Sequence, residues 1–164
     1  MTDIRKKLQT VTLGCSKNKV DTEHILSQVE NLYEIIPEGE DIPVDVLLIN
    51  TCGFIGDAKE ESIQAILEAV ERKKQGSVGK IVVFGCLSQR YGEDLYEEIP
   101  EVDIFLGVND YERLPQMVKG LAKGTRAKAF SCEPEAFEEF SARKLAENPY
   151  SATLRIAEGC NNRC

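Results

Sequence analysis

The sequence predicts an α/β fold: a doubly wound, mostly parallel sheet with helices on both faces. Two observations carry this prediction. The runs 44–50 and 81–84 are nearly continuous apolar stretches, which is typical of strands buried on both faces of a parallel sheet. Between them, residues 57–74 have helical periodicity, so strands and helices alternate along the chain.

The first elements each have a local signal. Residues 8–13 are apolar and β-branched, which predicts a strand that Gly14 ends. Apolar residues at helical spacing predict a helix over 19–33. A short second strand is expected over 33–36, where Pro37 closes it.

The helix expected after the strand at 44–50 has both of its ends marked. Asp57 and Glu60 resemble a capping box at its start. The basic residues 72–74 occupy its last turn, and Gly76 follows as a stop signal. Beyond the strand at 81–84, we expect a short helix near 92–98, a strand over 102–106 and a last helix containing residues 114–121.

The rest of the chain changes character. Residues 122–150 contain two prolines and several glutamates without a clear period, which predicts a linker. Residues 152–157 then predict a new strand. The expected organisation is therefore a domain over 1–121, a linker over 122–150 and the start of a second, truncated domain over 151–164.

Composition excludes several classes of protein. No apolar run approaches the roughly 20 residues that a membrane span needs, and the charged N-terminus is not a signal peptide. We therefore expect a cytoplasmic protein without a membrane partner, in a compartment where thiols stay reduced. The net charge of −8 argues against nucleic-acid binding by this domain, because such surfaces are usually basic.

Three of the six cysteines share one context. Cys15, Cys52 and Cys86 each follow a predicted strand by one small or polar residue. Ligands of doubly wound sheets bind at the carboxyl ends of the strands, so these thiols are expected to converge at one edge. Helix N-termini at the same edge stabilise thiolates.

Three thiolates without a fourth partner suit a cubane iron–sulfur cluster in which one iron stays open to another ligand. A zinc ion with three thiolates and a water is an alternative, and so is ordinary packing, because free cysteine is among the most buried residue types. The single histidine argues against a mixed Cys/His zinc site.

The chain ends in a second cysteine pattern. Cys160 and Cys164 form C-x3-C directly after the strand expected at 152–157, and one further cysteine would complete C-x3-C-x2-C. The alternative is a tail with two free thiols. Cys132 lies in the acidic linker without a strand before it, so we expect an ordinary thiol there.

Three stretches of the sequence surround the strand-end cysteines. They read LGCSKNKVDTE over 13–23, NTCGFI over 50–55 and GCLSQRY over 85–91. These stretches resemble the methylthiotransferase family of radical S-adenosylmethionine (SAM) enzymes. The resemblance is closest to the branch that modifies a small-subunit ribosomal protein. Transfer-RNA-modifying members usually have Gly-Cys-Gln-Met-Asn at the first stretch and Ser-Val-Arg after the second cysteine, and this chain has neither.

The resemblance implies two [4Fe-4S] clusters in the full-length enzyme. Cys15, Cys52 and Cys86 would hold the auxiliary cluster, and Cys160 and Cys164 would be two of the three ligands of the radical SAM cluster. The first strand of the SAM barrel would lie within 151–164. The expected fold of the front domain is Rossmann-like or flavodoxin-like.

The resemblance also implies an activity. Full-length members cleave SAM reductively with an external electron donor, and a methylthio group is inserted at the β-carbon of an aspartate in a small-subunit ribosomal protein. Without the third SAM-cluster cysteine and the barrel, residues 1–164 contain no catalytic residue and are expected to be inactive alone. Alternative readings are a transfer-RNA methylthiotransferase, a non-catalytic metal-binding or redox module, and a thiol-oxidation sensor.

Overall fold

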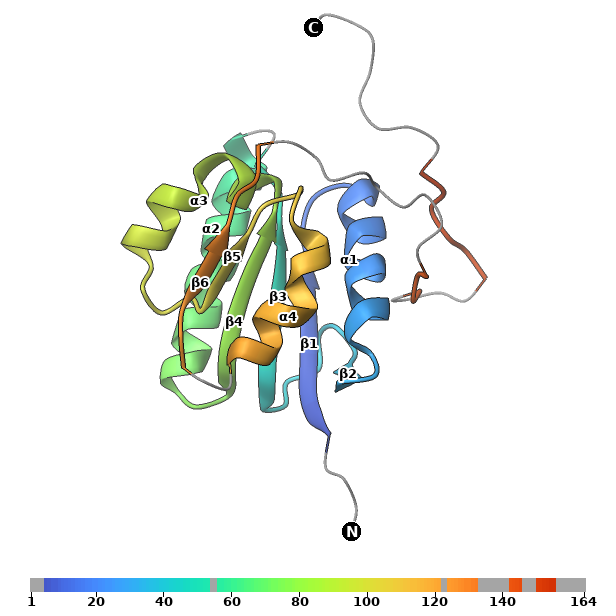
Figure 1. Cartoon of the computed structure of the whole chain (residues 1–164), viewed down its shortest axis with the longest axis horizontal. Helices are drawn as coiled ribbons and strands as arrows, with labels where there is room; N and C mark the ends of the chain where they lie inside the picture. The colour runs from blue at the N-terminus through green and yellow to red at the C-terminus, as the bar shows by residue number, and fades with distance from the viewer. Residues whose placement is uncertain (1–4, 54–55, 122–123, 133–141, 146–149, 156–164) are drawn as a thin grey trace, which may run out of the picture.

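The computed structural model describes residues 5–53, 56–121, 124–132, 142–145 and 150–155. A central parallel sheet lies between two layers of helices (Figure 1). The elements, in chain order, are β1 (Lys6–Thr12), α1 (Ser16–Val29), β2 (Tyr33–Ile36), β3 (Val44–Thr51), α2 (Gly56–Lys74), β4 (Val78–Gly85), α3 (Cys86–Glu98), β5 (Ile104–Leu106), the 3-10 helix η1 (Tyr111–Arg113), α4 (Leu114–Gly120) and β6 (Ala127–Ala129). None of the helices in these ranges is long and apolar enough to cross a membrane.

The sheet has the order β2-β1-β3-β4-β5-β6, and every neighbouring pair is parallel. The chain leaves β1 toward one edge to form β2 and then crosses back, so that β3 lies on the other side of β1. The direction of winding therefore reverses between β1 and β3, which is the switch point where doubly wound sheets bind ligands. The predicted α/β class and doubly wound sheet are confirmed.

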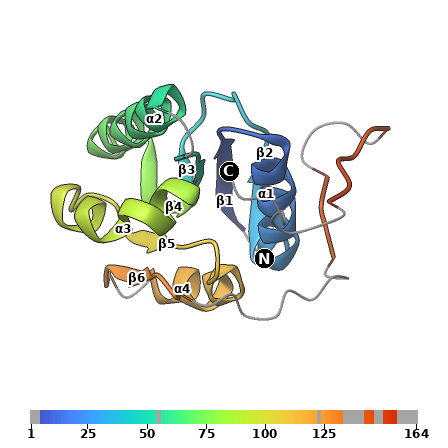
Figure 2. The same cartoon turned by 90° about the horizontal axis from the view of Figure 1, so that it is seen from above.

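Each face of the sheet has its own apolar core. Helices α1 and α4 cover one face, and α2 and α3 cover the other (Figure 2). Alternation along β3 divides the strand between the two cores: Val46 and Leu48 face α1 and α4, whereas Leu47 and Ile49 face α2 and α3. Burial on both faces explains why β3 and β4 read as continuous apolar runs.

The register of the sheet brings three strand ends to one level. Thr12, the last residue of β1, pairs with Asn50, and Thr51 at the end of β3 pairs with Gly85 at the end of β4. Whatever follows these three strands therefore emerges side by side at the carboxyl edge.

The structure departs from the predicted elements in two helices and after residue 121. The helix expected over 19–33 spans Ser16–Val29, and the helix expected near 92–98 begins at Cys86. β6 lies inside the segment expected as a linker, and it extends the sheet to Ala129. This strand has no apolar run to reveal it, and it is held by polar contacts: Arg126 donates to the carbonyls of Tyr96, Ile99 and Val102. Of the strand expected over 152–157, residues 152–155 have no regular secondary structure, and the remainder lies outside the described residues.

Candidate functional site

The three strand-end cysteines emerge at the carboxyl edge from three neighbouring strands. Cys15 follows β1 and is the N-cap residue of α1, Cys52 follows β3, and Cys86 is the first residue of α3 after β4. Cys15 is exposed, Cys86 is half-buried and Cys52 is buried. The strand order and register thus bring all three to the switch point, as the sequence predicts.

The loops that carry these cysteines approach each other closely. A Cβ added to Gly14, whose φ is +91°, would lie 2.7 Å from Cys52 Cβ and 3.0 Å from its sulfur. A Cβ added to Gly53 would lie 2.9 Å from the Cα atom of Leu87, the residue after Cys86. Only glycine fits either position, so the loop after β3 is packed against both of the other loops.

A buried network of asparagine side chains joins α1 to β3 and to the Cys15 loop. Asn50 Nδ2 donates to the Asn18 carbonyl (2.7 Å) and to Thr22 Oγ1 (3.0 Å), and Asn18 Nδ2 donates to Asn50 Oδ1 (3.2 Å) and to the Thr51 carbonyl (3.2 Å). The Cys15 thiol donates to Asn18 Oδ1 at 3.6 Å. Buried polar networks with every member satisfied hold one geometry, and this one sets the first two cysteine loops relative to each other.

The backbone of Cys52 is held from the other side by α2. Ser62 Oγ accepts a hydrogen bond from the Cys52 N–H and donates to the Cys52 carbonyl, both at 2.9 Å. Thr51 Oγ1 donates to the Phe84 carbonyl at 2.6 Å and so ties the end of β3 to β4. Because Ser62 and Thr51 are completely buried, water does not compete for these bonds.

Charge and burial have opposing effects on the protonation of the thiols. Burial raises the pKa of the Cys86 thiol, the neighbouring Cys52 raises it further, and Lys17 lowers it. The amino ends of α1 and α3 add the positive ends of two helix dipoles at Cys15 and Cys86. The positive charges favour the thiolates that a metal requires, whereas burial keeps the metal-free Cys86 protonated.

The donors are of the kind that an iron–sulfur cluster requires. Cys15, Cys52 and Cys86 offer three thiols from three neighbouring loops, and cysteine thiolates are the protein ligands of such clusters. The same three thiolates would also suit a zinc ion with a water as its fourth ligand. In the described part of the chain, no three Cys, His, Asp or Glu side chains are already placed so that they could hold a metal ion. The residues present thus fit a cluster by their chemistry.

Three further cysteines follow these in the sequence. Cys132 is described and exposed, beyond β6. Cys160 and Cys164 lie outside the described residues. The sequence patterns also missed the residues that position the site: Asn50 and Ser62. A polar residue at the end of an otherwise apolar run was the available signal for Asn50.

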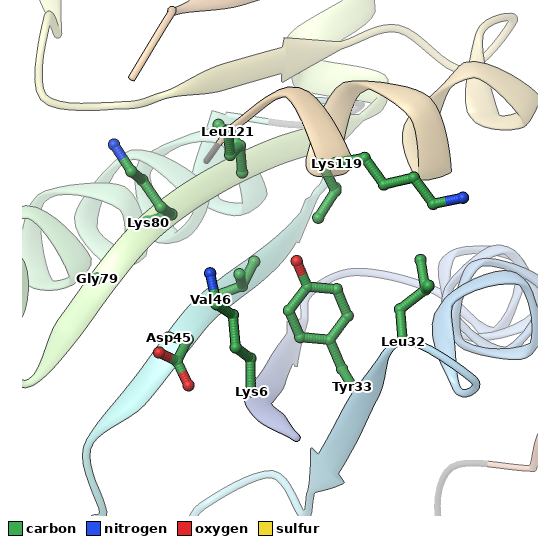
Figure 3. A pocket seen from close by; sticks show the side chains of 10 residues that line it. Lys6, Leu32, Tyr33, Asp45, Val46, Gly79, Lys80, Lys119 and Leu121 are labelled. Atoms are coloured by element: carbon green, nitrogen blue, oxygen red, sulfur yellow. The ribbon is translucent and has the colours of Figure 1, made fainter. Parts of the chain in front are cut away.

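A hollow at the opposite edge of the sheet is a separate feature. It has a volume of about 490 Å³, and Tyr33, Asp45 and Lys119 are among its lining residues (Figure 3). The hollow lies at the amino ends of the strands, where parallel α/β sheets do not usually bind ligands. The carboxyl ends of α1 and α4 lie beside it and carry partial negative charge, which opposes the attraction of its lysines for an anion. We therefore assign it no role.

Tyr111 forms a buried polar contact close to the cysteine edge. Its hydroxyl donates to Asp21 Oδ2 at 3.4 Å, and its ring packs edge-on against Phe84 with 5.7 Å between centroids. Burial holds the pKa of Tyr111 well above its ordinary value, and the Asp21 carboxylate raises it further. The phenol is therefore held protonated within the fold.

Replacing Tyr111 with phenylalanine is expected to reduce the decrease in the free energy of unfolding that occurs at alkaline pH. The unfolded chain releases the phenolic proton near the ordinary pKa of about 10, and the folded chain does so only at higher pH. The stabilisation is therefore complete below about pH 10 and declines above it by up to about 1.4 kcal/mol per pH unit. Urea unfolding of the wild type and of Tyr111→Phe across this range measures the difference.

The matched control for that comparison is Tyr150→Phe, because the Tyr150 side chain is 96% exposed. This variant should follow the wild-type pH dependence. If Tyr111→Phe shows the same alkaline slope as the wild type, the buried phenol does not account for the effect.

The fold and the site together define a class: a doubly wound α/β domain that presents three thiols at its switch point. The chain belongs to the family described as the uncharacterized protein family UPF0004, whose model matches residues 7–107. That range begins inside β1 and ends just after β5, so it contains all three strand-end cysteines.

Curated relatives extend the similarity over nearly the whole chain. Each of the following is named ribosomal protein uS12 methylthiotransferase RimO. The protein of Syntrophotalea carbinolica is 41% identical over 162 residues, covering 98% of this chain and 35% of the relative. Those of Clostridium botulinum and Geobacter sulfurreducens are 44% and 39% identical, covering 96% and 100% of this chain and 35% and 37% of the relatives. The predicted resemblance to methylthiotransferases is confirmed, and the chain spans about a third of the length of these relatives.

Proposed function

We propose that this chain carries the auxiliary cluster domain of a methylthiotransferase that acts on ribosomal protein uS12. The observation that supports it most directly is the convergence of Cys15, Cys52 and Cys86 at the switch point of the sheet. The relatives that cover nearly all of this chain are named for this activity on uS12. Because the chain spans only about a third of their length, the reaction belongs to a longer protein.

Each part of the chain has a proposed task. The sheet domain, expected over 1–121 and continued by β6, holds the auxiliary [4Fe-4S] cluster through its three thiolates. Residues 122–150 connect it to a second domain that begins within 151–164. There, Cys160 and Cys164 would bind the SAM cluster together with a third cysteine that this sequence does not contain.

When bound, the SAM cluster would pass an electron from an external donor to SAM, and the auxiliary cluster would supply sulfur to the acceptor carbon of an aspartate. The residues of this chain prepare the auxiliary site. Asn50 and Asn18 hold the first two cysteine loops together, and Ser62 fixes the backbone of Cys52. Since uS12 is made and assembled at the ribosome, the activity belongs in the cytoplasm.

Deleting the gene for the full-length protein is expected to remove the methylthio group from uS12 and to leave transfer RNA unchanged. Mass spectrometry of uS12 and of digested transfer RNA measures both products in one strain. The expectation rests on the residues beside the cysteines, such as Lys17 and Gly53, which match the protein-modifying branch. It also rests on the acidic balance of the chain, which opposes binding of a phosphate backbone.

Complementation makes the deletion experiment specific to the site. A full-length gene with Cys132→Ala should restore the modification of uS12, and one with Cys52→Ala should not. Loss of a methylthio-adenosine from transfer RNA, with uS12 still modified, would instead assign the enzyme to the RNA-modifying branch.

A further inference from the structure

The outer surface of α1 is covered by the chain that follows the sheet. The described residues of 142–145 and 150–155 run beside this helix in both views (Figures 1 and 2). The carbonyl of Ala142 accepts a hydrogen bond from Ser27 Oγ at 2.6 Å. One turn earlier on α1, the carbonyl of Glu23 accepts a hydrogen bond from the backbone N–H of Lys144 at 3.1 Å. The contact therefore involves backbone groups and has a defined register along the helix.

Two arginines of this segment pair with two acids of α1. Arg143 Nε lies 3.1 Å from Glu23 Oε2, and the two side chains are 19% and 3% exposed. Arg155 Nη1 lies 2.8 Å from Asp21 Oδ1, with exposures of 15% and 6%. Arg143 also donates to the Thr153 carbonyl at 2.6 Å, so the two parts of the segment are held together.

A third ion pair in the same contact is exposed to solvent, unlike the other two. Lys144 Nζ lies 3.0 Å from Glu30 Oε2, but both side chains are about 40% exposed. Exposed pairs of this sort contribute little, whereas removing one partner of a buried pair is strongly destabilising because a charge remains without compensation. Removing Arg143 or Arg155 is therefore expected to weaken the contact more than removing Lys144.

Asp21 links this contact to the cysteine edge. It accepts the hydrogen bond of Tyr111, whose ring packs on Phe84 two residues before Cys86. The same helix begins at the Cys15 loop. The segment thus contacts a helix that begins at the Cys15 loop and that reaches, through Tyr111, the strand that precedes Cys86.

We propose that Asp21 and Glu23 form a docking site on α1 for residues 142–145 and 150–155, and that Arg155 is the positioning residue for the chain that enters the C-terminal cysteine motif. Cys160 is the fifth residue after Arg155, and a chain of that length spans at most about 18 Å. Docking of Arg155 would therefore set an upper limit on the distance between the α-carbons of Arg155, held at Asp21, and Cys160.

Protection from chymotrypsin in the full 164-residue chain tests this docking. Tyr150 and Leu154 have exposed side chains, so the enzyme can cleave there once the backbone is released. The double variant Arg143→Ala/Arg155→Ala is expected to be cleaved at these sites about tenfold faster or more. Its free energy of unfolding in urea should fall only by the lost docking energy, about 1.4 kcal/mol for a tenfold change, because both arginines lie outside the sheet and its two cores.

Two matched variants separate docking from other causes. Lys144→Ala removes the exposed pair and should be cleaved within about twofold of wild type. Arg155→Lys keeps the charge and should retain part of the protection, whereas Arg155→Met keeps only the apolar stem and should lose it. The proposal is overturned if the double variant is cleaved like the wild type or if Arg155→Met protects as well as arginine. The assay contains no iron, so its result is independent of the proposed cluster.

Discussion

Replacing Cys52 with alanine is expected to abolish cluster binding. After anaerobic reconstitution, the wild-type site should take up about four iron atoms per chain, and the variant should fall to background. Cys52 lies between the other two cysteines in the sheet order, and its backbone is fixed by Ser62 on both sides. Two thiols on the first and third of three neighbouring strands cannot hold a cubane in its place.

The measurement needs a background without other iron-binding thiols. Cys160→Ala and Cys164→Ala should be present in every variant, so that iron and sulfide analysis reports on the strand-end site alone. Cys15→Ala and Cys86→Ala should behave like Cys52→Ala. Cys132→Ala is the matched control, because it removes an exposed thiol beyond β6 and should leave the iron content unchanged.

Two results would contradict this assignment of ligands. Iron content that survives Cys52→Ala would mean that the group binds elsewhere. Loss of iron in Cys132→Ala would add a ligand that the position of this residue does not predict.

Uptake of one zinc ion in preference to iron would favour the alternative of a simple metal-binding module.

The sequence was sufficient for the elements that depend on burial. β3 and β4 were predicted because strands covered on both faces must be apolar throughout, and α2 was predicted because its apolar stripe and its basic last turn are encoded locally. The helix begins at Gly56, so Asp57 lies inside the first turn and not at the N-cap position of the expected capping box. β6 was not predicted, because Ala-Lys-Ala has no burial pattern. The strand depends on tertiary partners: it pairs with β5, its alanines pack against one core, and Arg126 beside it binds three carbonyls.

The cysteines could be predicted from the sequence, whereas the residues that position them could not, because only the cysteines have a local signal. The strand-end context of Cys15, Cys52 and Cys86 is local, so the sequence predicts their convergence without the order of the strands. Asn50 acts through Asn18, which is 32 residues away. Asp21 acts through Arg155, which is 134 residues away. No local pattern encodes such partners, because each contact depends on how the whole sheet is assembled.

Replacing Gly85 with alanine is expected to destabilise the fold severely, because two penalties act at this position. The φ angle of Gly85 is +103° and its ψ is −165°, a region that only glycine adopts readily, and a side chain there costs about 1–3 kcal/mol. The added Cβ would also lie 2.5 Å from both Asn50 Oδ1 and the Thr51 carbonyl oxygen. Overpacking in a tight interior costs a further 1–3 kcal/mol or so.

The matched control is Gly39→Ala, which separates these two penalties. Gly39 has a similar φ of +88°, but a Cβ there meets nothing within 4 Å. We expect the free energy of unfolding in urea to fall by about 1–2 kcal/mol in this variant and by about 3–5 kcal/mol in Gly85→Ala. Gly85→Ala should also lose the cluster, because relief of the clash must displace Asn50 and with it the Cys15 and Cys52 loops. Equal losses of stability in the two variants would show that the close packing beneath the cysteines is not what requires glycine at residue 85.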